Sequence, residues 1–100
     1  MKIKINPLSV NECWQGRRYK TQKYKAYEKE MLLLLPKTFK DDFSELYIKV
    51  GVSTLKDIDN VLKPLLDILQ KKYGFNDRYI YKLTIEKEVV KKGNEFIEIC

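Results

Sequence analysis

The sequence predicts an α+β domain in which two helices pack on a mixed four-stranded sheet. The chain has 100 residues, which suits one domain with a single core. Its apolar residues recur with strand-like or helix-like spacing in the order strand, helix, strand, helix, strand, strand. Crossovers through the helices favour some parallel pairing, and the last two strands are expected to form an antiparallel hairpin. We therefore expect residues 1–100 to form one domain.

The first strand and the segment after it differ in character. Residues 2–6 alternate lysine with isoleucine, which is typical of a half-buried strand, and residues 7–11 carry the Pro, Ser and Asn of a loop. Residues 14–21 are basic and interleaved with aromatic side chains, which can bind phosphates and stack on exposed bases. The alternative is a surface hairpin whose Trp14 and Tyr19 pack in the core. A lone tryptophan is usually a packing residue, and Trp14 is therefore expected in the core.

Residues 21–35 predict the first helix, with Thr21 as its cap and Pro36 as its stop. Its apolar face consists of Tyr24, Tyr27, Met31, Leu34 and Leu35. The tyrosines are expected to pack in the core rather than to stack on bases. The other side carries Lys23, Lys25 and Lys29, a charge pattern that is more often a solvated face than a binding surface.

A polar loop over residues 37–44 leads to the second strand. Asp41 and Asp42 are adjacent in this loop, and we expect them to stabilise or solvate a turn rather than to bind a metal. Residues 45–52 alternate between apolar and polar side chains, as a strand does. The side chains that share its apolar face are Leu46, Ile48, Val50 and Val52.

The second helix lies at the centre of the chain. Its apolar face consists of Val61, Leu62, Leu65, Leu66 and Leu69. Asn60 is expected to cap it, because the amide oxygen can accept a hydrogen bond from a free N–H of the first turn, and Gly74 is expected to end it. Beyond it, residues 78–90 predict a long strand, residues 91–94 a turn, and residues 96–100 a strand that pairs back.

Charge and composition limit the classes of function. The formal net charge of +6 favours a polyanionic partner, although a merely basic soluble protein is equally consistent with it. The chain has no histidine, which excludes His-based general bases, catalytic triads and His-ligated zinc. Cys13 and Cys100 have no metal-binding spacing, and a disulfide between them stays open. There is no signal peptide or membrane-length apolar run, so we expect no membrane contact and a reducing, cytoplasmic setting.

Carboxylates bracket the second helix and suggest a site for a hard metal ion. Asp57 and Asp59 stand at its start, and Asp77 follows its end. Mg²⁺ prefers carboxylate oxygens, waters and substrate phosphates, and Lys63 lies one turn from Asp59. Spacing alone favours a simpler interpretation over a metal site. In this interpretation, Asp57 and Asp59 complement the positive end of the helix dipole. Asp67 suits a salt bridge to a lysine one turn away as well as it suits a metal role.

Three segments of this region resemble the RusA family of Holliday junction resolvases. They are Asp57-x-Asp59-Asn60-x-x-Lys63, Leu65-Leu66-Asp67 and Gly74-Phe75-Asn76-Asp77. The family consists of small, dimeric, magnesium-dependent endonucleases that cut four-way DNA junctions. The resemblance implies that Asp57, Asp59 and Asp77 bind the metal and that Lys63 is the functional lysine. This chain has Asn76 where the family often has an acid, which leaves one fewer acid near the metal.

The same resemblance implies the remaining site residues and partners. The expected catalytic residues are Asp57, Asp59, Asp77 and Lys63, and the expected DNA-binding residues are Arg17, Arg18, Lys20, Asn60 and Lys63. Arginines suit this role because they fork onto phosphates. We expect Mg²⁺ or its substitute Mn²⁺, no nucleotide cofactor, and a homodimer that acts on branched DNA. The implied setting is the cytoplasm of a bacterial cell or of a phage-infected or prophage-carrying host.

Two other classes of function stay open. A non-catalytic, basic nucleic-acid-binding module of the same fold would explain the charge, and it predicts salt-sensitive binding that does not need the aspartates. A small structural or regulatory protein with a protein partner would explain only the apolar faces. Junction cleavage with and without Mg²⁺ separates the nuclease from both.

Overall fold

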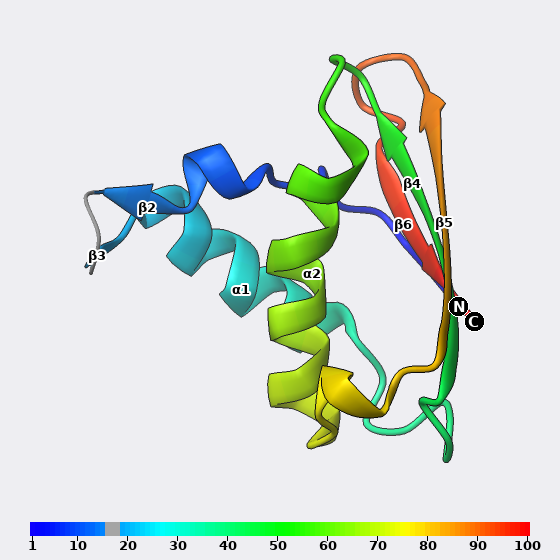
Figure 1. Ribbon diagram of the computed structural model, residues 1–100. Coiled ribbons are helices and arrows are strands. Elements are labelled where there is room, and N and C mark those ends of the chain that lie inside the picture. The colour runs from blue at the N-terminus through cyan, green and yellow to red at the C-terminus, as the bar shows by residue number, and fades with distance from the viewer. Residues whose placement is uncertain (16–18) are drawn as a thin grey trace.

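The computed structural model describes residues 1–15 and 19–100, and it confirms the predicted α+β architecture (Figure 1). The elements in chain order are β1 (Lys2–Ile3), η1 (Val10–Glu12), β2 (Trp14–Gln15), β3 (Tyr19–Lys20), α1 (Gln22–Leu34), β4 (Glu45–Val52), α2 (Ile58–Tyr73), η2 (Asp77–Tyr79), β5 (Lys82–Val89) and β6 (Phe96–Ile99), where η marks a short 3-10 helix. Both α-helices lie on one side of a four-stranded sheet, and the other face of the sheet is open (Figure 1).

The core lies between this sheet and the two α-helices. The side chains of β4 alternate as the sequence predicts, and the buried ones are Leu46, Ile48, Val50 and Val52. α1 contributes Tyr24, Tyr27 and Met31, and α2 contributes Val61, Leu65, Ile68 and Leu69. The predicted cap of α1 is also confirmed, because the Thr21 hydroxyl oxygen accepts a hydrogen bond from the Tyr24 N–H at 3.1 Å.

The strand order of the sheet is β1-β6-β4-β5, with β4 and β5 parallel and α2 as their crossover. The predicted hairpin between the last two strands is wrong, because β6 lies on the far side of β4 and pairs antiparallel with both β4 and β1. Burial explains this order. Phe96, Ile97 and Ile99 of β6 are buried, whereas β5 is mostly exposed and carries lysines and glutamates that suit the edge of a sheet.

Three details of the amino-terminal half differ from the prediction. β1 is shorter than expected, although Ile5 beyond its end is still buried. The assignment of Trp14 to the core is wrong, because 43% of this residue is exposed, and its ring packs at 6.1 Å from the ring of buried Tyr24. Leu34 is likewise 43% exposed at the end of α1. Tyr24 and Tyr27 fill the core as predicted, and they leave the tryptophan on the surface.

The loop before β4 behaves as the sequence predicts. The Asp42 carboxylate accepts hydrogen bonds from the Ser44 backbone N–H at 2.9 Å and from the Ser44 hydroxyl at 3.0 Å. These two bonds hold the pKa of Asp42 below its usual value, with the backbone bond as the larger cause. Asp42 therefore stabilises a turn.

Candidate active site

Asp57 stands at the amino terminus of α2 and leaves its carboxylate largely free. The helix begins at Ile58, so Asp57 is the cap position, and the prediction that Asn60 caps the helix is wrong. The Asp57 carbonyl accepts the Asn60 N–H at 3.1 Å, but its side chain makes no capping bond. The carboxylate accepts one long hydrogen bond, 3.5 Å, from the Asn60 amide nitrogen. Among residues 1–15 and 19–100 no other group donates to this carboxylate, so its remaining lone pairs can accept bonds from a ligand.

Two lysines fix the backbone that carries Asp57. The Lys87 ammonium, from β5, donates a hydrogen bond to the Lys56 carbonyl at 2.6 Å, and the Lys56 ammonium donates to the Pro7 carbonyl at 2.6 Å. These charge-assisted bonds tie the start of α2 to β5 and to the amino-terminal segment. Neither contact could be predicted from the sequence, because Lys87 has the pattern of a solvated side chain in an alternating strand and Lys56 lies in the connection between β4 and α2.

The polar face of α2 continues from Asp59 through Lys63 and Asp67, all of them exposed. Of the two roles left open for Asp67, the salt bridge to Lys63 or Lys71 is not formed. Lys71 instead pairs with Glu28 of α1 at 3.1 Å, and within residues 1–15 and 19–100 Asp67 has no cation within 4.0 Å. Lys63, at four residues from Asp59, likewise makes no ion pair in the described ranges. Its ammonium is therefore available to a phosphate.

Asp77 follows the carboxyl terminus of α2 in a well-anchored turn. Gly74 ends the helix with φ of 71°, a backbone conformation that favours glycine. The Phe75 ring stacks on Phe43 with a centroid distance of 4.3 Å and an interplanar angle of 6°. Asn76 then caps η2, since its side-chain oxygen accepts the Arg78 N–H at 3.0 Å. Position 76 thus has a structural role, which an aspartate at this position would also fill.

The three aspartates do not meet within one chain. Asp57 and Asp59 lie at one end of the 16-residue helix α2 and Asp77 lies beyond the other end (Figure 1). A helix of this length spans about 24 Å. Accordingly, among the described residues no three acidic or cysteine side chains of one chain are placed to hold a metal ion together. The donors themselves, exposed carboxylate oxygens, are of the kind that Mg²⁺ prefers.

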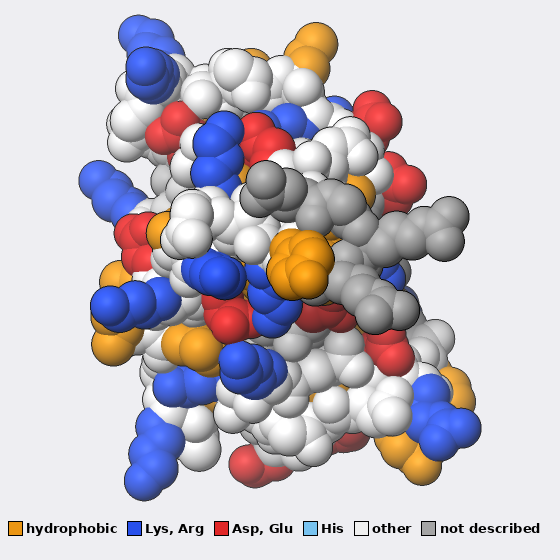
Figure 2. Space-filling view, turned by 90° about the vertical axis from the view of Figure 1, so that its left-hand side faces the viewer, with side chains coloured by type: hydrophobic (Ala, Val, Ile, Leu, Met, Phe, Trp, Pro, Cys, Tyr) orange, Lys and Arg blue, Asp and Glu red, His pale blue; other side chains and the backbone are white. Residues whose placement is uncertain are grey.

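The basic segment projects from the amino terminus of α1 as a two-stranded hairpin, β2–β3. Arg17 and Arg18 lie outside the described residues. The Lys20 ammonium nitrogen lies 3.5 Å from a carboxylate oxygen of Glu28 and 5.0 Å from the centre of the Tyr24 ring. Tyr19 is 73% exposed. Figure 2 views the molecule from the side of this hairpin and shows many basic side chains with acidic ones between them.

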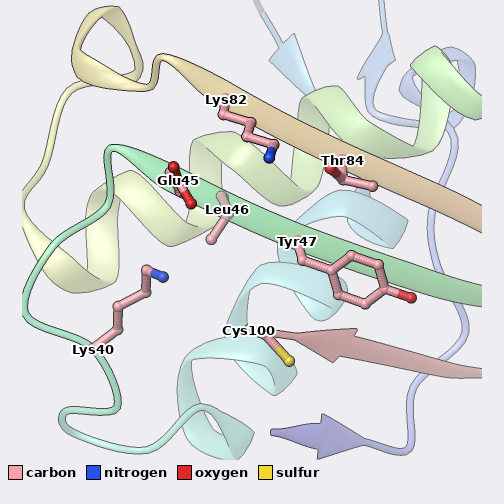
Figure 3. Close-up of a pocket in the computed structure, with 7 residues that line it drawn as sticks. All are labelled: Lys40, Glu45, Leu46, Tyr47, Lys82, Thr84 and Cys100. Atoms are coloured by element: carbon pink, nitrogen blue, oxygen red, sulfur yellow. The ribbon is translucent and has the colours of Figure 1, made fainter.

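A shallow pocket of about 290 Å³ lies on the open face of the sheet, away from the predicted site residues. It is lined by Lys40, Glu45, Leu46, Tyr47, Lys82, Thr84 and Cys100 (Figure 3). The Tyr47 hydroxyl donates to Glu86 at 2.8 Å, and this bond raises the pKa of Tyr47 to about 12. The hydroxyl of Tyr47 is therefore protonated at neutral pH.

The two cysteines form no disulfide bond, and Cys13 is not a reactive thiol. Cys13 and Cys100 are both free thiols, and burial raises the pKa of Cys13 to about 11, so this thiol is not a nucleophile at neutral pH. In the part of the chain that the structure describes, neither α-helix is long and apolar enough to cross a membrane.

Comparison with known protein families gives a match over nearly the whole chain. A family model described as "Endodeoxyribonuclease RusA" matches residues 5–100, which is nearly the whole chain. No curated protein matches the chain. The matched range includes the three aspartates, Lys63 and the basic hairpin.

Proposed function

Because the chain belongs to the RusA endodeoxyribonuclease family, we propose that it is a Mg²⁺-dependent nuclease that resolves four-way DNA junctions. One observation carries the proposal beyond the family match. Asp57 occupies the cap position of α2 without a side-chain capping bond, so a capping hydrogen bond does not account for this carboxylate. The substrate, branched DNA in recombination and repair, implies work in the cytoplasm of a bacterial or phage-infected cell.

The residues of this chain divide the proposed work among them. Asp57, Asp59 and Asp77 would hold the metal, with the Asn60 amide orienting the Asp57 carboxylate. When bound, Mg²⁺ or Mn²⁺ supplies Lewis-acid activation and neutralises charge on the scissile phosphate. The ammonium of Lys63, one turn from Asp59, would bind a phosphate oxygen and stabilise the negative charge of the transition state.

We further propose a homodimer, because two copies of the chain can bring together the three aspartates that lie apart within one chain. A two-fold axis perpendicular to α2 would run the two copies of this helix antiparallel. Asp77 of the partner subunit would then approach Asp57 and Asp59, and each dimer would have two symmetric sites, as paired cuts require.

An apolar surface is available for this contact. One row of apolar side chains along α2 is only partly buried. α2 also packs beside β5, and most of β5 is exposed. The side chains concerned are Ile58, Leu62 and Leu66 of α2 with Leu83 and Val89 of β5, of which Ile58 is 38%, Leu83 37% and Val89 61% exposed. A second copy of α2 would cover this surface.

Metal removal tests the proposed function directly. A synthetic four-way junction should be cut in Mg²⁺ and left intact when EDTA is added in excess, while linear duplex of the same sequence is cut far less. Gel electrophoresis of end-labelled strands measures both. Metal-dependent cutting of all DNA alike would indicate a general nuclease. Salt-sensitive binding without any cutting would indicate a non-catalytic DNA-binding module.

Replacing Arg17 and Arg18 with alanine should weaken binding to every DNA. Each lost phosphate contact lowers the slope of log affinity against log salt concentration by about 0.9, so the pair should lower it by about 2. Fluorescence anisotropy across a salt series measures this slope. A slope equal to that of the parental protein would place both arginines away from DNA.

A further inference from the structure

Asp77 lies in a turn, so the position of its carboxylate depends on how firmly the backbone of this turn is held. η2 comprises only Asp77–Tyr79, and the residues before it form the connection from α2. The aromatic anchor acts on Phe75, two residues earlier, and the Asn76 side chain holds the Arg78 N–H, one residue later. Neither contact engages the backbone of Asp77 itself.

The side chain of Gln70, in the last turns of α2, makes that contact. Its amide oxygen accepts a hydrogen bond from the Asp77 N–H at 2.9 Å. Its amide nitrogen donates to the Leu66 carbonyl at 3.2 Å, one turn back along the helix. Both ends of the amide are therefore engaged, and this fixes which atom faces Asp77. The bond ties the turn to a rigid helix.

We propose that Gln70 is a positioning residue for catalysis, which sets the direction of the Asp77 carboxylate through its backbone N–H. The inference rests on the proposed function, because it assigns Gln70 to a site that contains Asp77. A displacement of about 1 Å at a reacting group can cost up to about 100-fold in rate. Gln70 therefore affects turnover rather than DNA binding.

Three variants separate this role from general support of the fold. Gln70→Met keeps the size of the side chain and removes the acceptor. Gln70→Glu keeps an oxygen that can accept the Asp77 N–H. Lys72→Met is the matched control, because it removes another bond between side chain and backbone from the same end of α2, the 3.2 Å bond from Lys72 to the Leu32 carbonyl, without contact to the turn.

The first measurement needs neither metal nor DNA. Amide hydrogen exchange, followed by NMR, should show that the Asp77 N–H exchanges about tenfold faster in Gln70→Met than in the parental protein, as expected for the loss of one hydrogen bond. Exchange at this amide should stay near the parental rate in Gln70→Glu and in Lys72→Met. Equal exchange rates of the Asp77 N–H in Gln70→Met and in the parental protein would show that Gln70 does not hold this amide.

The second measurement is junction cleavage in saturating Mg²⁺. Gln70→Met should lower kcat about tenfold or more with KM for the junction unchanged, and Gln70→Glu should restore most of kcat. Lys72→Met should cleave at the parental rate. Faster exchange without loss of kcat in Gln70→Met, or an equal loss in Lys72→Met, would overturn the positioning role. Failure of the proposed function is distinguishable, because the parental protein itself would then not cleave.

Discussion

Asp57→Asn and Asp59→Asn should each abolish junction cleavage while junction binding stays intact or becomes tighter. Each change removes a negative charge at the start of α2 and keeps the shape of the side chain. The loss of one group that stabilises charge in the transition state typically costs about 10²–10³-fold in rate, and the loss of a metal ligand should cost at least that much. Binding should not suffer, because less negative charge then faces the phosphates. Cleavage and anisotropy assays on one junction measure both.

Asp67→Asn is the matched control for these two variants. It removes the same charge from the same helix face, and Asp67 has no ion pair in the described ranges that the change would break. We expect it to cleave at nearly the parental rate. Parental cleavage by Asp57→Asn or Asp59→Asn would show that the metal assignment is wrong.

A mixed dimer of Asp57→Asn and Asp77→Asn chains should recover cleavage that neither variant has alone. If each site takes Asp57 and Asp59 from one chain and Asp77 from the other, the mixed dimer has one site with both substitutions and one intact site. If a single chain supplies all three aspartates, both sites are defective. Co-expression with two different affinity tags gives the mixed dimer in pure form.

The intact site in the mixed dimer should nick junctions at about half the parental rate per dimer, without paired cuts, because only one of two symmetric sites works. The control is a mixed dimer of Asp57→Asn with Asp59→Asn, which has a defect in both sites under either arrangement and should be inactive. An inactive Asp57→Asn and Asp77→Asn dimer, beside an active parental dimer, would assign all three aspartates to one chain.

The helices and β4 could be predicted from sequence because their signals are local. Apolar spacing sets the faces of α1 and β4, and Thr21 and Gly74 mark helix ends by their own chemistry. The pairing of β6 could not be predicted in this way. The turn at 91–94 favours a hairpin locally, but burial of β6 beside β4 is a property of the assembled sheet.

The sequence indicates candidate site residues by their type, but it does not give the geometry that relates them. The spacing of Asp57 and Asp59 indicated their common position, and the rise of a helix would have placed Asp77 far from them in one chain. The side chains that support the site could not be anticipated. Gln70, Lys56 and Lys87 act through backbone groups distant in sequence, and nothing in an exposed lysine or glutamine indicates such a partner.

Because β6 lies between β1 and β4, the four-stranded sheet cannot form until β6 has been synthesised. The pairing of Lys2 with Glu98 joins segments from opposite ends of the chain, and the entropy cost of closing such a loop rises with its length. Until then β1 has no partner and one edge of β4 is open, a state in which nascent chains can pair wrongly. Formation of the sheet therefore depends on pairing between strands distant in sequence and is expected to be slow.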